Sequence, residues 1–370
     1  MSLYLSVDCG GSKTLAAIAN ASGDIVGRAV GGPSNFAYVG PAVFIETVRE
    51  TVINALKACP DLPFTTEIQL PPPVRVFAYA WFGVSGVDSQ ADIANVTPPL
   101  SSLLSIPPGP RLSVGNDAQL LAAPVHFHKD VRYAVTAVGG TGSICVSFKE
   151  GADGKMEEMG RVGGWGWVLG DEGGGFHVGR EAIRQVLIEY DKASVGPPHS
   201  ATGPKKTLTD RIIEHFGINH LLEVLSLIHY PDPPSTISQD VILTTPPNLA
   251  YRLIPREKRL SQLSPLVFQS AFEDHDPIAI RVLSTTSDML AEEIAILLRP
   301  EDGEGPFPSR AVKASESVMC FGGSLVGIES YRNLVLKALE RRGHVFKYVE
   351  FVSDAAALGA TGLAAAAQLL

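Results

Sequence analysis

The sequence predicts a two-lobed α/β protein in which a mixed β-sheet occurs twice, with a cleft between the two copies. Three observations support this class. The chain has 370 residues, which is more than one hydrophobic core usually serves. Short apolar segments bounded by glycine-rich turns alternate with longer helical segments. A strand–glycine turn–strand unit occurs near the N-terminus and again after residue 132, which indicates a duplicated lobe.

The first half of the chain predicts an antiparallel meander followed by alternating helices and strands. The glycines of the first turn, residues 10–11, lie in a hairpin, whereas a Walker or Rossmann phosphate loop opens a helix. We expect strands at 3–7, 15–19, 25–30, 74–84 and 112–114, helices at 42–58 and 118–123, and a proline-rich loop at 98–110.

The second half repeats the hairpin and then becomes mainly helical. We expect strands at 133–138, 143–148 and 317–321, helices across 177–298 and at 328–341 and 355–370, and flexible insertions at 196–206 and 230–248. We assign residues 1–117 to the N-terminal lobe and 118–354 to the C-terminal lobe. The alanine-rich helix at 355–370 is expected to pack back onto the N-terminal lobe.

Composition and charge exclude several classes of protein. The net charge of −9 argues against a nucleic-acid partner, because phosphate backbones require clustered lysine and arginine. The sequence contains no run of about 18 apolar residues that could span a membrane. The N-terminus lacks the pattern of a secretory signal, so a cytosolic protein is expected. The cysteines form no CxxC pair, and we interpret them as small buried hydrophobic residues: Cys9, Cys59, Cys145 and Cys320.

Two glycine-rich hairpin turns are candidate phosphate sites. Adjacent glycines let backbone N–H groups approach phosphate oxygens without a Cβ clash. The first turn offers Gly10, Gly11, Ser12, Lys13 and Thr14, and the second offers Thr141 and Gly142. Asp8 ends the first strand and could hold Mg²⁺ through water. Each turn alone could be a plain hairpin, but two at equivalent places suggest a triphosphate held from both sides.

A third turn and a single carboxylate complete the candidate chemistry. The strand at 317–321 runs into Gly322, Gly323 and Ser324, a turn that can lie flat against an adenine or ribose, although a plain strand–helix turn has the same sequence. Asp117 follows a strand and opens a helix, where it could accept a proton from an alcohol. The alternative is an ordinary N-capping aspartate.

Residues 163–175 combine glycine, tryptophan and acidic residues at unusual density. Fixing so much glycine is costly in backbone entropy. Tryptophan supplies a flat apolar surface, and carboxylates accept hydrogen bonds from hydroxyl groups, two features that carbohydrate sites share. The candidate residues are Gly164, Trp165, Asp171 and Glu172. A purely structural turn remains the alternative.

In this order and spacing, these segments resemble the N-acetylglucosamine kinases and the wider BadF/BadG/BcrA/BcrD ATPase family over essentially the whole chain. The resemblance implies an actin-like ATPase (ribonuclease H-like) fold, with ATP, Mg²⁺ and a sugar in the cleft, and phosphoryl transfer to the sugar 6-hydroxyl. It also implies roles for single residues. Gly10 to Thr14 and Thr141 match phosphate contacts, Gly322 and Gly323 match the adenosine motif, and Asp117 matches the catalytic base. Asn35, Gly164, Trp165 and Asp171 match sugar contacts.

We add Ser85, which ends the strand at 74–84, to the expected sugar site, and we expect a homodimer. The chain departs from the family pattern at Cys9, Phe36 and Ile144. Ile144 stands where mammalian-type enzymes carry a sugar-binding asparagine, which leaves the sugar open among N-acetylglucosamine, glucosamine, glucose and N-acetylmuramate types. An ATPase that activates an iron–sulfur dehydratase or reductase, and a non-catalytic sugar sensor, are the alternatives from other classes.

Overall fold

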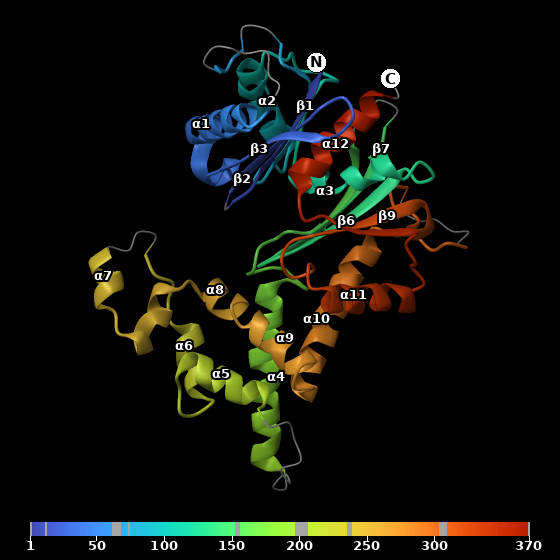
Figure 1. Cartoon of the computed structure of the whole chain (residues 1–370). Coiled ribbons are helices and arrows are strands. Elements are labelled where there is room, and N and C mark those ends of the chain that lie inside the picture. Colours follow the sequence, from blue (N-terminus) through green and yellow to red (C-terminus); the bar gives the residue numbers. More distant parts are fainter. Residues whose placement is uncertain are drawn as a thin grey trace.

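The computed structural model describes residues 2–11, 13–60, 68–72, 75–151, 156–196, 206–234, 239–302 and 309–368. These residues form two lobes, each built on a five-stranded mixed sheet with helices packed against it (Figure 1). The predicted α/β class with a duplicated mixed sheet is therefore confirmed. In the described part of the chain, no helix combines the length and apolar character that crossing a bilayer needs.

The first sheet has the strand order β3-β2-β1-β4-β5. Its strands are β1 (Leu3–Cys9), β2 (Thr14–Ala19), β3 (Ile25–Gly31), β4 (Phe77–Val84) and β5 (Leu112–Gly115). The first three strands form the predicted antiparallel meander, and β4 and β5 extend the sheet in parallel with β1. Because side chains alternate along β1, Leu5 and Val7 pack in the core with α1 (Phe36–Lys57) and α2 (Gln90–Leu104), whereas Tyr4 faces the last helix of the chain.

The second sheet repeats this topology with the order β8-β7-β6-β9-β10. Its strands are β6 (Tyr133–Gly139), β7 (Ser143–Glu150), β8 (Met156–Gly163), β9 (Ser317–Gly322) and β10 (Tyr348–Phe351). As in the first sheet, the first three strands in chain order pair antiparallel, and the last two extend the sheet in parallel with β6. The turn after β1 and the turn after β6 are therefore topological equivalents, as the repeated hairpin predicts.

Helices cover the second sheet and extend away from it. The large core of this lobe joins the sheet to α4 (Gly175–Val195), α9 (Ser264–Phe272), α10 (Pro277–Ile296) and α11 (Glu329–Arg341). Figure 1 shows the remaining helices of this lobe on the side of α4 that lies toward α1, and we call them the helical wall. They are α5 (Leu208–Phe216), α6 (Glu223–His229), α7 (Gln239–Thr244), the 3₁₀ helix η2 (Pro247–Leu253) and α8 (Arg256–Ser261).

A third apolar cluster joins the two sheets. It contains Trp81 of β4, Leu120 of α3 (Ala118–Leu121), and Phe148 and Val318 of the second sheet, together with residues of the 3₁₀ helix η1 (Ala123–Phe127). The last helix, α12 (Ala355–Ala367), packs on β1 and β2, and both chain ends lie on the same side of the molecule (Figure 1). The Thr361 hydroxyl of α12 donates to the Gly23 carbonyl at 3.0 Å. The lobe boundary at 117/118 stays a prediction.

The predicted loop at 98–110 is wrong over its first half, because Pro98 and Pro99 lie inside α2. A capping box formed by Ser89 and Asp92 starts this helix, and four apolar side chains in its later turns are buried: Val96, Leu100, Leu103 and Leu104. Burial of this face outweighs the low helix propensity of proline.

Other element boundaries also differ from the prediction. Helix α1 begins at Phe36, with non-helical backbone at Gly40 before Pro41, and β4 begins at Phe77. The strands β8 and β10 were not predicted. The insertion at 230–248 contains α7, whereas residues 197–205 of the other insertion lie outside the described residues.

Candidate functional site

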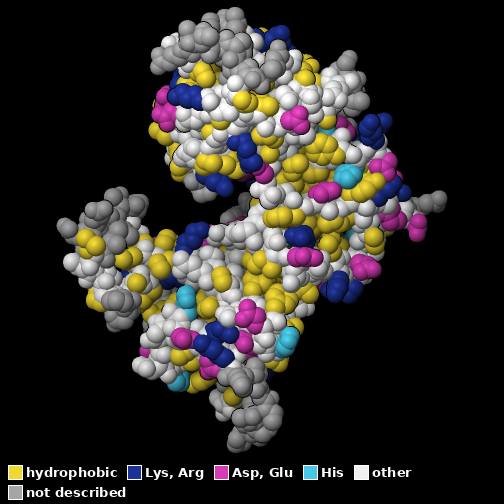
Figure 2. Space-filling view, viewed as in Figure 1, with side chains coloured by type: hydrophobic (Ala, Val, Ile, Leu, Met, Phe, Trp, Pro, Cys, Tyr) yellow, Lys and Arg dark blue, Asp and Glu magenta, His cyan; other side chains and the backbone are white. Residues whose placement is uncertain are grey.

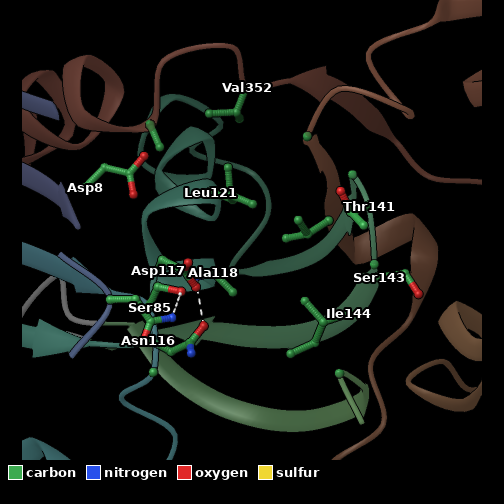
Figure 3. Close-up of a pocket in the computed structure, with 18 of the residues that line it drawn as sticks. Asp8, Ser85, Asn116, Asp117, Ala118, Leu121, Thr141, Ser143, Ile144 and Val352 are labelled. Atoms are coloured by element: carbon green, nitrogen blue, oxygen red, sulfur yellow. Dashed lines mark hydrogen bonds between the residues drawn. The ribbon is translucent and has the colours of Figure 1, made fainter. Parts of the chain in front are cut away.

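A cavity of about 900 Å³ lies between the lobes, where strand ends from both sheets meet. Its volume falls within the usual range for small-molecule sites. Figure 2 shows a deep hollow between the lobes, and Figure 3 shows the residues of the cavity at closer range. The predicted residues that line this cavity are Asp8, Lys13, Asn35, Ser85, Asp117, Thr141, Gly142, Gly164, Gly323 and Ser324.

Asp117 is placed by the short β5 strand and the turn that starts α3. It occupies the N-cap position of α3, but its side chain makes no capping hydrogen bond. The amide N–H of Ala118 donates instead to Asn116 Oδ1 at 3.0 Å (Figure 3). Burial raises the pKa of Asp117, a hydrogen bond from the Ser85 hydroxyl acts against this, and the nearby charge of Asp88 adds to it. The Asp117 carboxyl group is thus not occupied in capping its own helix.

Asn35 and Ser85 form the neighbouring wall of the cavity. Asn35 Nδ2 donates to Ser85 Oγ at 3.1 Å, while Asn35 Oδ1 is buried and has no hydrogen-bond partner among the described residues. Gly86 follows Ser85 with a positive φ of 82°, and a Cβ there would lie 2.5 Å from Asn35 Oδ1. Glycine is therefore required for Asn35 to sit here. A buried amide oxygen without a partner can accept a hydrogen bond from a ligand hydroxyl.

The first hairpin turn brings Lys13 into the cavity. The Gly10 amide donates to the Lys13 carbonyl at 3.0 Å. Gly10 and Gly11 are not among the lining residues, and Ser12 lies outside the described residues. Thr14 is fully buried, and its hydroxyl donates to the Gly32 carbonyl at 2.6 Å. The Thr14 hydroxyl thus ties β2 to the turn that follows β3, and it does not reach the cavity.

The second hairpin turn is held from behind by α4. The amides of Gly175 and Phe176 donate to the carbonyls of Gly140 and Thr141 at 2.8 and 2.9 Å. In addition, Lys258 Nζ of α8 donates to Thr141 Oγ1 at 3.0 Å. Lys258 was missed from the sequence, since it lies 117 positions from its partner, and no local pattern distinguishes it from other surface lysines. The helical wall thus supplies a cation to this turn.

The turn after β9 lies directly against the second hairpin. The Leu325 amide donates to the Gly139 carbonyl at 2.8 Å, which places Gly323 and Ser324 on the cavity wall. Gly322 does not line the cavity; a Cβ there would lie 2.7 Å from Leu121 Cδ1.

The segment 163–175 is divided between the cavity and its surroundings. Gly164 lines the cavity, while Trp165 is 63% exposed and lies outside the lining residues. Asp171 is buried, has a positive φ of 63°, and its Oδ1 accepts from the Ser143 amide at 3.2 Å. A Cβ on Gly142 would come within 2.6 Å of this carboxylate, so Asp171 supports the second hairpin turn from behind. Strained backbone of this kind is concentrated at functional sites.

Glu172 is also turned away from the cavity. Its two carboxylate oxygens accept from Arg180 Nη2 at 3.0 Å each, and the Ser143 hydroxyl donates to its carbonyl at 2.7 Å. Glu293 of α10, which the sequence did not single out, stands close by. Burial, with Glu172 and Asp171 adding to it, raises the pKa of Glu293 to about 7.

Carboxylates dominate the charge of the cavity. Among the described lining residues the charged side chains are Asp8, Lys13, Asp88 and Asp117. Burial raises the pKa of Asp8 to about 7, with the Asp117 charge adding to the effect and Lys13 opposing it. A divalent cation would relieve this crowding of buried negative charge. No three described side chains of the ligating types cluster tightly enough to enclose a metal.

The matched family accounts for this arrangement. Residues 5–364 match the model of the BadF/BadG/BcrA/BcrD ATPase family. The chain belongs to this family. The two repeated sheets, which meet at a cavity between them, agree with the actin-like fold that the resemblance implied.

Curated and solved proteins similar to the chain include sugar kinases. An N-acetyl-D-glucosamine kinase of Dictyostelium discoideum is 25% identical over 309 residues, 83% of each chain. An N-acetylmuramic acid/N-acetylglucosamine kinase of Clostridium acetobutylicum is 27% identical over 194 residues, which cover 52% of this chain and 56% of that one. A crystal structure of a candidate N-acetylglucosamine kinase from Chromobacterium violaceum has a TM-score of 0.56 at 20% identity, covering 98% of this chain and 99% of that one.

The buried hydroxyl of Thr14 leads to a first prediction. Thr14→Val should lower the free energy of unfolding by about 1–2 kcal/mol, because the buried Ser34 hydroxyl and the Gly32 carbonyl both lose the Thr14 hydroxyl as hydrogen-bond partner. Thr14→Ser, which keeps the hydroxyl, should stay within about 0.5–1 kcal/mol of wild type. Urea denaturation followed by circular dichroism measures both. Equal stability of the valine variant and wild type would contradict the structural role.

Proposed function

We propose that this protein is an ATP-dependent sugar kinase that transfers the γ-phosphoryl group of ATP to the 6-hydroxyl of N-acetylglucosamine. One observation carries the proposal: Asp117, a carboxyl group whose pKa is raised by partial burial, faces the same cavity as two topologically equivalent hairpin turns. The names of the curated relatives support an amino sugar as the acceptor. Glucosamine, glucose and N-acetylmuramate are the alternative acceptors.

The phosphate side of the cavity consists of the two hairpin turns. Backbone N–H groups and the Thr141 hydroxyl donate to the phosphates, and Lys13 and Lys258 supply positive charge from opposite lobes. Asp8 is the residue that would hold Mg²⁺, through water. When bound, this ion neutralises phosphate charge and orients the γ-phosphoryl group. The turn at Gly323 and Ser324 would receive the adenosine part of the nucleotide.

The sugar side is formed by Asn35, Ser85, Asp117 and Gly164. Asn35 Oδ1 accepts a hydrogen bond from a sugar hydroxyl, which satisfies the amide oxygen that has no described partner. Asp117 accepts the proton of the 6-hydroxyl as this oxygen attacks the γ-phosphoryl group. Trp165 is an exposed side chain that follows Gly164 of the cavity wall, and approach of the lobes would bring its flat face against the N-acetyl group. Asp171 and Glu172 act through the loop backbone that they hold.

A sugar panel with coupled ADP detection tests the proposal. N-acetylglucosamine should give the highest kcat/KM, with glucosamine, glucose and N-acetylmuramate tested beside it, and the product should carry phosphate on O6 by NMR. A different preferred sugar would correct the substrate and leave the reaction class intact. Absence of phosphorylation of every sugar, with ATP bound, would favour the sugar sensor instead.

Removing the carboxylate of Asp117 gives a second prediction. Asp117→Asn keeps the volume of the side chain but removes the proton acceptor, so kcat should fall by about 10²–10⁴-fold. Binding of ATP, measured by isothermal titration calorimetry, should change less than about twofold because no phosphate contact is lost. Asp191→Asn, on the exposed end of α4, is the matched control. Near-normal turnover of Asp117→Asn would remove this residue from the mechanism.

Lys258 provides a third prediction. Lys258→Ala should raise the KM for ATP about 10-fold, since a hydrogen bond to a charged phosphate contributes ~1.5 kcal/mol. The KM for the sugar should stay near the wild-type value, because among the described residues Lys258 donates its hydrogen bond to Thr141 of the second hairpin turn. Lys337→Ala, an exposed lysine of α11, is the control. An unchanged KM for ATP would show that Lys258 does not contact the nucleotide.

The iron–sulfur alternative is disfavoured by the placement of the cysteines. Cys9, Cys145 and Cys320 are fully buried, and burial raises the pKa of each thiol. None of these three can reach a cluster bridged across a subunit interface, and Cys59 alone does not provide a bridge. A colourless protein without iron after anaerobic purification is expected. The predicted cytosolic location, the homodimer and the lack of a nucleic-acid partner stay predictions.

A further inference from the structure

We infer that Asp88 and Arg161 are positioning residues that link the sugar loop of one lobe to the base Asp117 of the other. The inference rests on the proposed function and names two residues that neither the sequence motifs nor the family resemblance assigned to the site. Neither residue need touch a ligand. Their part is to hold the turn on which Asp117 stands and to balance the charge beside it.

The link consists of three hydrogen bonds in series. Arg161 Nη1 donates to Asp88 Oδ1 at 2.7 Å, and Asn116 Nδ2 donates to the same oxygen at 3.0 Å. Asn116 Oδ1 in turn accepts from the Ala118 amide at 3.0 Å. Asn116 and Ala118 flank Asp117 in the chain, so the backbone on either side of the base is fixed by the side chain that Asp88 anchors (Figure 3).

The two ends of this link belong to different lobes. Asp88 follows β4 of the first sheet, whereas Arg161 lies in β8 at the edge of the second sheet. Arg161 also underlies the sugar loop, since a Cβ on Gly164 would come within 3.0 Å of Arg161 Nη2. The ion pair therefore connects the start of the 163–175 segment to the turn that carries the base.

The exposure of the ion pair separates a functional role from a structural one. The side chains of Arg161 and Asp88 are 30% and 49% exposed, and pairs with this access to solvent contribute little to folding stability. A large loss of catalysis without a comparable loss of stability would therefore report positioning. Small displacements of a reacting group are enough, because misplacement by about 1 Å can lower a rate 100-fold.

Charge provides a second signature. Asp88 raises the pKa of Asp117, and Arg161 is the cation bound to Asp88. The other charged groups lining the cavity are Asp8 and Lys13, which the proposed variants leave in place. Asp88→Asn should lower the pKa of Asp117, so the acid limb of kcat/KM moves to lower pH. Arg161→Met leaves the Asp88 charge without its partner and should move the same limb to higher pH.

The experiment compares Arg161→Met, Asp88→Asn and the double variant with wild type, and uses the preferred sugar of the panel. Arg161→Met should lower kcat/KM for the sugar about 10–100-fold, while the KM for ATP changes less than about twofold. The double variant should keep the acid limb where Asp88→Asn alone places it, since Arg161 acts through Asp88. Arg161→Lys, which keeps the charge, should restore the limb toward the wild-type pH.

Controls separate this inference from the proposed function. Arg341→Met removes an arginine of another exposed ion pair, the one with Asp288, and should alter neither kcat/KM nor the acid limb. Thermal unfolding should place all variants near wild type. This inference alone is overturned if the wild-type enzyme is active but the acid limb moves in the same direction, or does not move, in both Arg161→Met and Asp88→Asn. A wild-type protein that phosphorylates no sugar would overturn the proposed function and the inference with it.

Discussion

Parallel pairing of β1, β4 and β5 is the constraint on which the site depends. The register aligns Asp8 with Gly83, and Gly83 with Gly115, so the carboxyl ends of the three strands open at one edge of the sheet. Asp8, Ser85 and Asp117 come from those three ends. Crevices at the carboxyl ends of strands are the general ligand sites of α/β sheets. The second sheet repeats the pairing, and its strand ends supply the second hairpin turn and Gly323.

This convergence concentrates negative charge that the fold itself does not balance. Asp8 and Asp117 are both buried enough for their pKa values to rise, and among the described residues Lys13 is the only cation that lines the cavity with them. Buried charge without a partner opposes folding. In the proposed function, the divalent cation that accompanies the nucleotide would offset this negative charge beside Asp8. Arg161 and Lys258 stand just outside the cavity and bring positive charge to its rim from the C-terminal lobe.

The sequence was sufficient for what is local. The hairpins, the meander and the helix after Asp117 follow from glycine spacing and apolar runs, and most of the expected site residues do line one cavity. The features that the sequence could not indicate depend on contacts between distant residues or on burial. Strand β8 contains two glycines and two glutamates and lies at a sheet edge, so it shows no alternation. The roles of Lys258 and Arg161 depend on hydrogen-bond partners that lie 117 and 73 positions away in the sequence. The glycine-rich turn beside Thr14 predicts that its hydroxyl contacts phosphate. In the structure the side chain is buried, and its hydroxyl donates to the Gly32 carbonyl instead.

The choice of sugar depends on how polar and apolar contacts are divided across the cavity. Ile144 lines the wall next to Gly164, at a position where the family resemblance implied an amide. An apolar wall cannot satisfy a hydroxyl, so a sugar that points a hydroxyl there loses affinity, whereas a methyl group gains contact area. The Asn35 Oδ1 atom, which has no described partner, requires a hydrogen-bond donor instead. A sugar that carries both an acetyl methyl group and free hydroxyls meets the two requirements together, whereas glucose meets only the second.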